Sequence, residues 1–237
     1  MEPYEVVEYK GFKINIYPDD SAESPRERDN LGKMVCFHRR YSLGDKHKFS
    51  SPSSFHRELA MELDPELERR IDYWENGDGW IHLQPDYKAA DKKVHNLIEK
   101  TIDKNCIMLP LYLYDHSGIT MSTGPFSCPW DSGQVGYIYI SIQDIKKEYS
   151  WKVLTKEHRR LIEDVLQSEV RVYDYFIRGD VFGYKILDPD GEERDSCWGF
   201  YGSNHEKSGL LDSAREFIDW IRGDENETHN PVTQPSL

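Results

Sequence analysis

The segment 33–57 gathers basic and imidazole side chains in a chain that is otherwise acidic. Six bases and three histidines stand there against one acid, Asp45. These are Lys33, Arg39, Arg40, Lys46, Lys48 and Arg57, with His38, His47 and His56. A guanidinium group presents a planar fork of donors that matches phosphate and carboxylate oxygens. The segment therefore indicates an anion-recognition site, unless its bases simply pair with some of the 43 carboxylates of the same chain.

A second segment, 113–133, carries the residue types of acid–base and nucleophilic chemistry, namely Asp115, His116, Cys128 and Asp131. Asp115 and His116 are adjacent, so their side chains diverge on a strand, and catalysis would need partners from elsewhere. No flanking pattern resembles a hydrolase or cysteine-protease motif. The alternative is an ordered loop in which Asp and Ser satisfy turn amides.

The two segments together support one functional hypothesis. Two histidines with one or two carboxylates suit a divalent metal, and arginines suit a phosphate ester. The protein would then be an enzyme, or a protein that sequesters a ligand, with a pocket for a nucleotide or other phosphate-containing small molecule. The pocket would comprise His38, Arg39, Arg40, Asp45, His47, Asp115, His116 and Asp131. No motif calls for a cofactor.

Glycines alternate with aromatic residues in a third region, 173–184 and 195–202. Such a pattern indicates rings that pack across glycine gaps, or a ligand that lies close to the backbone. Exposed rings could also stack on a base. Core packing is the plainer interpretation.

Acidic residues dominate the 237-residue chain, with 43 Asp and Glu against 30 Lys and Arg and a net charge of −13. Eight acids lie between positions 58 and 78, and twelve between 188 and 227. Carboxylates on one face can bind a basic cleft that normally holds phosphates, with salt-sensitive association. The alternative is that acidity only confers solubility. The candidate binding face comprises Glu58, Glu62, Glu66, Asp72 and Glu75.

The four cysteines lie far apart and form no closely spaced pair. Structural zinc sites usually take ligands from such pairs, and disulfides are rare in cytosolic chains of this size. We therefore expect free thiols, with neither a structural zinc nor a disulfide.

Hydrophobic spacing predicts several strands and helices. Alternation predicts strands over 12–17, 34–37, 107–114 and 135–142, and a hairpin of 181–187 with 193–201. The strand over 34–37 would pair with the first strand. Helical spacing predicts a helix that starts at a Ser53 or Ser54 cap and is interrupted at Asp64-Pro65 before it continues. It also predicts helices over 85–105, 155–177 and 210–221. Gly179 would end the second of these three and Gly223 the last. The segment 115–133 would be turn-rich.

The elements lack a steady βαβ rhythm, which favours an α+β fold. We expect a mixed, largely antiparallel sheet, hairpins near both ends and packed helices. A single domain would span 1–222 with a helical insertion at about 50–105, followed by a disordered tail over 223–237. The longest apolar stretch, 107–114, is too short to span a membrane, and the N-terminus has no apolar signal region. We expect no membrane association and a cytoplasmic location.

Three segments carry a family resemblance: NLGKMVCFHRRYSLGDKH, LPLYLYDHSGITMSTGPFSCPWDSGQVGYIYIS, and YDYFIRGDVFGYKI with DSCWGFYG. They resemble an uncharacterised family of proteins encoded by bacteriophages and mobile elements. The resemblance covers most of the chain from Phe12 to Gly202, apart from 50–105. It implies a genomic setting whose accessory genes often act on the host, including its defence systems. It implies no catalytic residue.

The leading hypothesis is a non-catalytic acidic interaction protein of a phage or mobile element, acting in the host cytoplasm. It would inhibit a host nucleic-acid-binding or defence complex by binding a partner with a basic, nucleic-acid-binding surface. The negative net charge argues against direct nucleic-acid binding. Convergence of the eight pocket residues would instead favour the enzyme or ligand-binding hypothesis.

Overall fold

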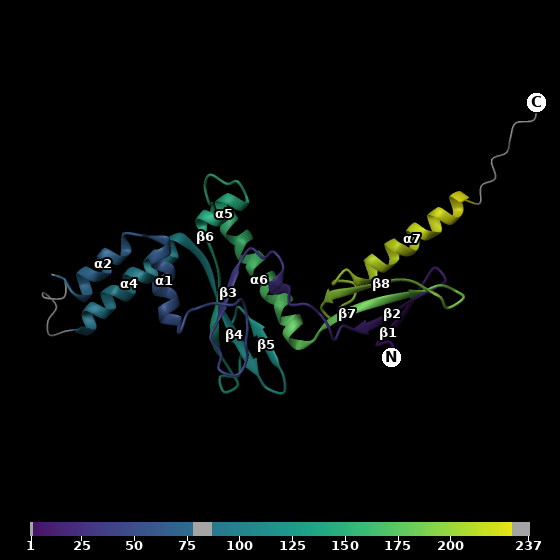
Figure 1. Ribbon diagram of the computed structural model, residues 1–237, viewed down its shortest axis with the longest axis horizontal. Helices are drawn as coiled ribbons and strands as arrows, with labels where there is room; N and C mark the ends of the chain where they lie inside the picture. The colour runs from purple at the N-terminus through teal and green to yellow at the C-terminus, as the bar shows by residue number, and fades with distance from the viewer. Residues whose placement is uncertain (1, 78–86, 229–237) are drawn as a thin grey trace, which may run out of the picture. The chain divides into compact units, whose positions relative to one another are not determined.

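The computed structural model describes residues 2–77 and 87–228. It has an α+β fold with two antiparallel sheets, as the sequence predicts. The chain divides into two compact units (Figure 1). Unit 1 comprises Met1–Glu27 and Val172–Leu237, and unit 2 comprises Arg28–Arg171. The expectation of one body over 1–222 did not anticipate this division.

Unit 1 contains a four-stranded antiparallel sheet in the order β1-β2-β7-β8. The strands are β1 (Glu5–Tyr9), β2 (Phe12–Pro18), β7 (Val181–Leu187) and β8 (Glu193–Tyr201). The alternation in β2 and the β7–β8 hairpin were predicted and are confirmed. Strand β1 was not predicted. A short 3-10 turn, Pro25–Glu27, follows β2.

Helix α7 (Leu210–Thr228) covers one face of this sheet (Figure 1). Leu210, Ala214 and Ile218 lie four residues apart and pack on buried strand residues such as Ile14 and Ile186. The helix continues past Gly223, where the sequence predicted its end. Residues 224–228 of the predicted tail are therefore helical, and 229–237 lie outside the described residues.

A glycine gap on the sheet of unit 1 confirms one interpretation of the third sequence region. A Cβ atom at Gly183 would lie only 2.3 Å from the ring of Trp198. The Trp198 indole lies 6.3 Å from the Tyr17 ring, measured between centroids. The missing side chain at position 183 therefore lets an aromatic ring rest on the strand.

Unit 2 contains the second sheet, in the order β3-β6-β4-β5. The strands are β3 (Lys33–Cys36), β4 (Cys106–Asp115), β5 (Ile119–Ser122) and β6 (Ser132–Ser141). The predicted pairing of the strand at 34–37 with the first strand is wrong, because β3 pairs with β6. Both sides of β2 are occupied, by β1 and β7. Strand β5 lies in the segment that was predicted to be turns.

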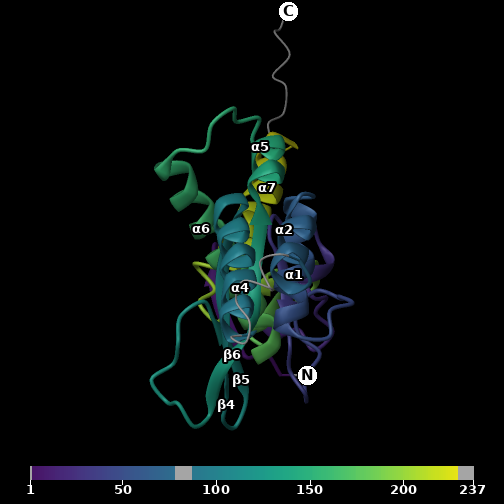
Figure 2. The same cartoon turned by 90° about the vertical axis from the view of Figure 1, so that its left-hand side faces the viewer.

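Three helices of unit 2 pack together between β3 and β4 in sequence (Figure 2). They are α1 (Pro52–Leu63), α2 (Leu67–Glu75) and α4 (Tyr87–Asn105). The N-cap of α1 is Ser51, rather than the predicted Ser53 or Ser54. Its hydroxyl accepts from the Ser54 backbone N–H, and the Ser54 hydroxyl accepts from the Ser51 N–H, both at 3.1 Å. The predicted break at Asp64-Pro65 is confirmed.

Two further helices follow β6. The short α5 (Ile142–Glu148) was not predicted, and Ser141 caps it by accepting from the Asp144 backbone N–H. The long α6 (Lys156–Arg178) ends at Gly179, which has a φ of +75°, as the sequence predicted. Its residues up to Arg171 belong to unit 2, and the rest belong to unit 1. Within the described ranges, no helix combines the length and apolar character needed to cross a membrane.

Candidate functional site

Five of the eight predicted pocket residues line one cavity of about 480 Å³ in unit 2. These five are His38, Arg39, Arg40, Asp45 and His47. Cys36, Tyr41, Ser42, Leu43 and Lys46 complete the wall. The loop that forms the cavity begins at the end of β3, so the first residues of this loop are anchored to the sheet.

Backbone-directed contacts hold this loop in shape. The Asp45 carboxylate accepts from the Met34 N–H at 2.7 Å, and the Asp45 N–H donates to the Met34 carbonyl at 2.8 Å. His47 donates from Nε2 to the Cys36 carbonyl at 2.8 Å. Gly44 has a φ of +71°, and a Cβ there would lie 2.7 Å from the Met34 oxygen. Asp45 and His47 therefore build the loop, which leaves Arg39, Arg40 and Lys46 as its cations.

His38 and Asp115 position the groups at the rim of the cavity. His38 Nδ1 accepts from the backbone N–H groups of Arg40 and Tyr41 at 3.3 and 3.2 Å. The His38 ring stacks on the Tyr41 ring at 5.0 Å. Asp115, at the end of β4, accepts from Arg40 Nη1 at 3.0 Å and from the Tyr41 hydroxyl at 3.2 Å. Asp115 thus joins the cavity residues through Arg40.

The two remaining pocket residues, His116 and Asp131, form a separate group. His116 Nδ1 lies 3.4 Å from Asp131 Oδ2, and the Cys128 thiol donates to the same oxygen at 3.6 Å. Neither His116 nor Asp131 lines the 480 Å³ cavity. In the part of the chain that the structure describes, Cys128 has no hydrogen bond to an imidazole of the kind that activates a nucleophilic thiol.

Metal-ligating side chains do not converge within residues 2–77 and 87–228: no group of three or more His, Cys, Asp or Glu could hold an ion there. All four cysteines are free thiols. Burial raises the pKa of the Cys106 thiol to about 12. Cys106 is therefore protonated at neutral pH, which disfavours a role as a nucleophile.

Three of the five residues of the predicted acidic face on α1 and α2 pair with neighbouring bases. Its ion pairs join Glu58 to Lys48 at 3.1 Å, Glu75 to Arg57 at 2.7 Å and Glu66 to Arg69 at 3.4 Å. Asp72 accepts from the Asn76 side-chain amide at 2.9 Å. Glu62 lies apart from these pairs, on the wall of a second cavity. The structure thus brings together carboxylates and bases here, rather than carboxylates alone.

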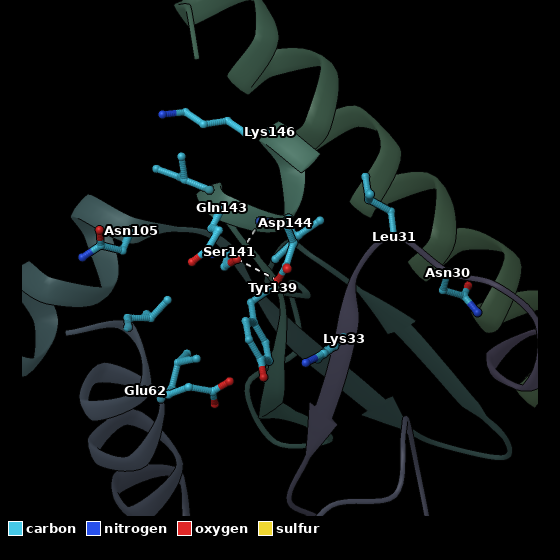
Figure 3. A pocket seen from close by; sticks show the side chains of 14 residues that line it. Asn30, Leu31, Lys33, Glu62, Asn105, Tyr139, Ser141, Gln143, Asp144 and Lys146 are labelled. Atoms are coloured by element: carbon cyan, nitrogen blue, oxygen red, sulfur yellow. Dashed lines mark hydrogen bonds between the residues drawn. The ribbon is translucent and has the colours of Figure 1, made fainter. Parts of the chain in front are cut away.

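The second cavity has a volume of about 680 Å³ and lies between β3, α1, α4 and α5 (Figure 3). Lys33 and Lys146 balance Glu62 and Asp144 on its wall. Burial raises the pKa of Tyr139, which also lines the cavity, to about 12, so its phenol stays neutral. This cavity could not be predicted from the sequence, because the residues that line it come from positions 30–146 and share no motif or spacing.

The net negative charge is concentrated in unit 1. That unit holds 21 Asp and Glu against nine Lys and Arg, a net charge of −12. Unit 2 holds 22 against 21, a net charge of −1. Unit 1 therefore carries nearly all of the net negative charge of the chain.

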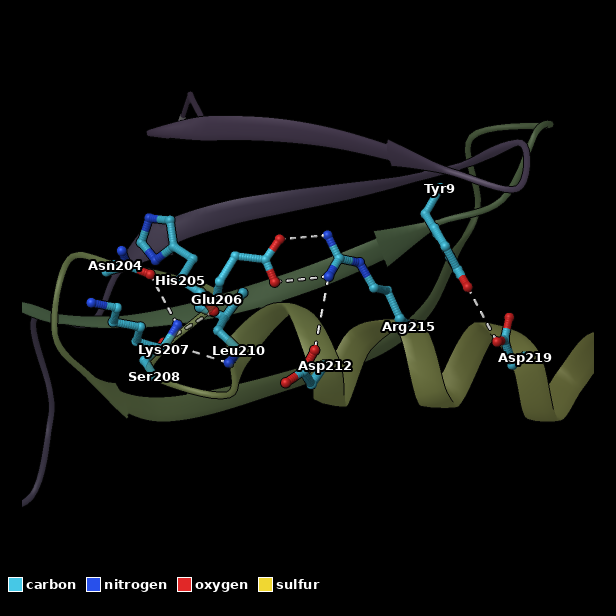
Figure 4. A network of polar contacts seen from close by, with 10 residues as sticks. All are labelled: Tyr9, Asn204, His205, Glu206, Lys207, Ser208, Leu210, Asp212, Arg215 and Asp219. Atoms are coloured by element: carbon cyan, nitrogen blue, oxygen red, sulfur yellow. Dashed lines mark hydrogen bonds and ion pairs between the residues drawn. The ribbon is translucent and has the colours of Figure 1, made fainter.

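Several bases of unit 1 pair with carboxylates of the same unit, and Figure 4 shows Arg215 between Glu206 and Asp212. Arg215 donates to both carboxylate oxygens of Glu206 at 2.8 Å, and Lys10 donates to Asp219 at 2.6 Å. These bonds lower the pKa values of Glu206 and Asp219. Both carboxylates are thus held in the charged form. Arg178, Lys185 and Arg194 also pair with carboxylates of this unit.

Comparisons of the chain with protein-family models, with curated proteins and with solved structures find no match. The resemblance to a phage-encoded family therefore stays a prediction. Function has to be inferred from the geometry and charge of the described residues.

Proposed function

We propose that this protein is a non-catalytic interaction protein that binds a basic partner through unit 1. The observation that carries the proposal is the charge partition, −12 in unit 1 against −1 in unit 2. A concentrated charge of one sign attracts an oppositely charged surface over a distance comparable to the Debye length, and so raises the association rate. The partner would be a host protein whose basic surface normally binds nucleic acid, and binding would inhibit it.

The outer face of α7 supports this role by combining charge with an apolar anchor. Asp212, Glu216 and Asp219 are exposed there, while the opposite side of the helix is buried on the sheet. Arg215 pairs with Asp212 and Lys10 with Asp219, so the net charge of the unit, rather than these three residues alone, attracts the partner. Trp220, beside them, is 61 % exposed. Exposed Trp residues are frequent energetic centres of protein interfaces, and surrounding charges mainly guide association.

The acidic surface proposed here lies on unit 1, whereas the sequence predicted it on α1 and α2. Glu58, Glu66 and Glu75 of α1 and α2 pair with bases, and unit 2 as a whole has a net charge of only −1. Unit 1 has 12 carboxylates more than bases, so ion pairing inside the unit cannot neutralise it. The two surfaces therefore make different predictions for charge-reversal variants.

The test compares two double variants that change the net charge equally. Asp212→Lys with Glu216→Lys alters unit 1, and Glu66→Lys with Asp72→Lys alters α2 as the matched control. A partner is first captured from host lysate, purified, and its binding kinetics are measured at low and high salt. We expect the unit 1 variant to lower the association rate at least about tenfold at low salt, with little change in the control.

Two results would contradict the proposal. One is binding that does not weaken as salt rises. The other is a control variant that lowers the association rate as much as the unit 1 variant does. Circular dichroism and melting temperatures of both variants establish that the fold is intact before kinetics are compared.

A further inference from the structure

The cavity of about 480 Å³ that follows β3 has a wall suited to an anion, in a unit that the proposed partner interaction does not involve. Three cations, Arg39, Arg40 and Lys46, line it. The carboxylate on the wall, Asp45, already accepts from the Met34 N–H. We propose that this cavity binds a small molecule that carries a phosphate or diphosphate group.

Contacts with Asp115 and Tyr41 position the Arg40 guanidinium at the cavity before a ligand binds. Its Nη1 donates to Asp115 at 3.0 Å, and its Cζ lies 5.2 Å from the centroid of the Tyr41 ring. A guanidinium has five N–H donors, so one bond to Asp115 leaves others for phosphate oxygens. The Arg40 side chain is nevertheless 70 % exposed, which makes these donors accessible. Fixing the arginine in advance lowers the entropy cost of binding.

The two histidines of the wall add polar groups. His38 Nδ1 accepts from two backbone N–H groups, so the proton of the neutral ring is on Nε2, which can donate to a ligand. His47 donates from Nε2 to the Cys36 carbonyl, while its Nδ1 is buried and has no hydrogen-bond partner among the described residues. That nitrogen carries no proton when Nε2 donates, so His38, rather than His47, is the imidazole that can donate to a phosphate.

Phosphate matches this wall better than a carboxylate or a long polyanion does. A phosphate group offers three or more acceptor oxygens and multiple charge, which three cations and an imidazole can share. The cavity volume lies in the range that holds small ligands. The net charge of −13 disfavours a nucleic acid, because its many phosphates extend far beyond the few local cations.

The test titrates the full chain with inorganic pyrophosphate and with ADP by isothermal calorimetry. The cavity variants are Arg39→Gln and Lys46→Gln, and the matched controls are Arg160→Gln on α6 and Lys92→Gln on α4. All four side chains are exposed, and each control lies outside the cavity wall. We expect saturable binding that weakens at least about fivefold in each cavity variant and less than about twofold in each control.

ADP that binds more tightly than pyrophosphate would identify a nucleotide as the ligand, and equal affinities would identify the phosphate group as the recognised part. Absence of saturable binding of both probes, or equal weakening in cavity and control variants, would overturn the proposal. If Arg39→Gln lowers the melting temperature, Lys46→Gln carries the comparison. Failure here leaves the proposed partner interaction untouched, because that interaction is measured with unit 1 variants.

Discussion

Burial divides the four cysteine thiols into two pairs. Cys36 and Cys106 are buried, while Cys128 and Cys197 are partly exposed. Burial, with the charges of Asp144 and Glu62 nearby, raises the pKa of Cys106 to about 12. We expect Cys128 and Cys197 to react with a thiol reagent in the native protein at pH 8, and Cys36 and Cys106 to react only on unfolding. Mass spectrometry of the labelled peptides checks this, and rapid native labelling of Cys106 would contradict it.

Two glycines of the same strand, β6, provide a second test at the level of single residues. A Cβ at Gly136 would lie 2.0 Å from the Val35 carbonyl oxygen, across the β3–β6 pairing. A Cβ at Gly133 would meet nothing within 4 Å. We expect Gly136→Ala to lower the free energy of unfolding by about 1–3 kcal/mol or more, because the backbone must shift. Gly133→Ala should change it by less than about 1 kcal/mol in either direction. Urea unfolding measures the free energy of unfolding of both variants. An equal loss in the two variants would contradict the close approach of β3 to Gly136.

At the level of elements, periodicity predicted local structure well and strand partners poorly. The alternation of Phe12, Ile14 and Ile16 identifies β2 because one face of that strand is buried on α7. The same alternation carries no information about which strand lies alongside, so β3 was paired with β2 although it belongs to the other sheet. Strand β1 escaped prediction because it is an edge strand whose Glu5, Val6 and Glu8 are exposed.

The candidate sites also differ in whether their residues are close together or far apart in the sequence. The cluster of cations at 38–47 was predicted because its residues are close in sequence and therefore close in space. Pairing of the bases of 33–57 with carboxylates of the same chain was one of the two interpretations, and Lys48 and Arg57 follow it. Their partners could not be named from spacing, since Arg57 and Glu75 come from different helices. The charge partition also depends on the way in which 1–27 and 172–237 come together. Sequence spacing alone does not reveal such long-range contacts.

The Arg57–Glu75 ion pair links α1 to α2 and predicts a pH-dependent stability. Its hydrogen bonds to Arg57 hold the pKa of Glu75 below its usual value. A carboxylate with a lowered folded-state pKa stabilises the protein at neutral pH, and this contribution is lost as pH falls through that pKa. Because both side chains are over a third exposed, we expect Glu75→Gln to cost no more than about 1 kcal/mol at pH 7.

The difference between wild type and Glu75→Gln should begin to shrink once the pH falls to about 4, where the carboxyl becomes protonated in the unfolded chain. It should disappear below the lower folded-state pKa, where the carboxyl is protonated in both states. Urea unfolding at pH 7, 5 and 3 measures it. Glu68→Gln, a change of an acid on the same helix, is the control for lost charge. A difference that stays constant from pH 7 to 3 would show that the ion pair does not contribute.

For the whole molecule, the charge partition has a consequence for stability as well as for binding. The carboxylates of unit 1 repel one another in the folded state, because that unit has a net charge of −12. Unit 2, at −1, has almost no net self-repulsion. Added salt screens repulsion between exposed charges, and the Debye length falls from about 30 Å at 0.01 M to about 10 Å at 0.1 M. Salt should therefore stabilise unit 1 selectively.

Hydrogen exchange followed by peptide mass spectrometry tests this for both units in one experiment. Raising sodium chloride from about 0.01 M to about 0.3 M should slow exchange in β2 and β7 of unit 1 more than in β4 and β6 of unit 2. Potassium acetate at equal ionic strength should act alike, because screening depends on ionic strength rather than on the ion. The net effect in unit 1 is protective only if repulsion outweighs its ion pairs, such as Lys10–Asp219 and Arg215–Glu206, which salt also weakens. Faster exchange in unit 1 at high salt would show that these pairs dominate, and that the excess carboxylates are too far apart to form one acidic surface for a basic partner.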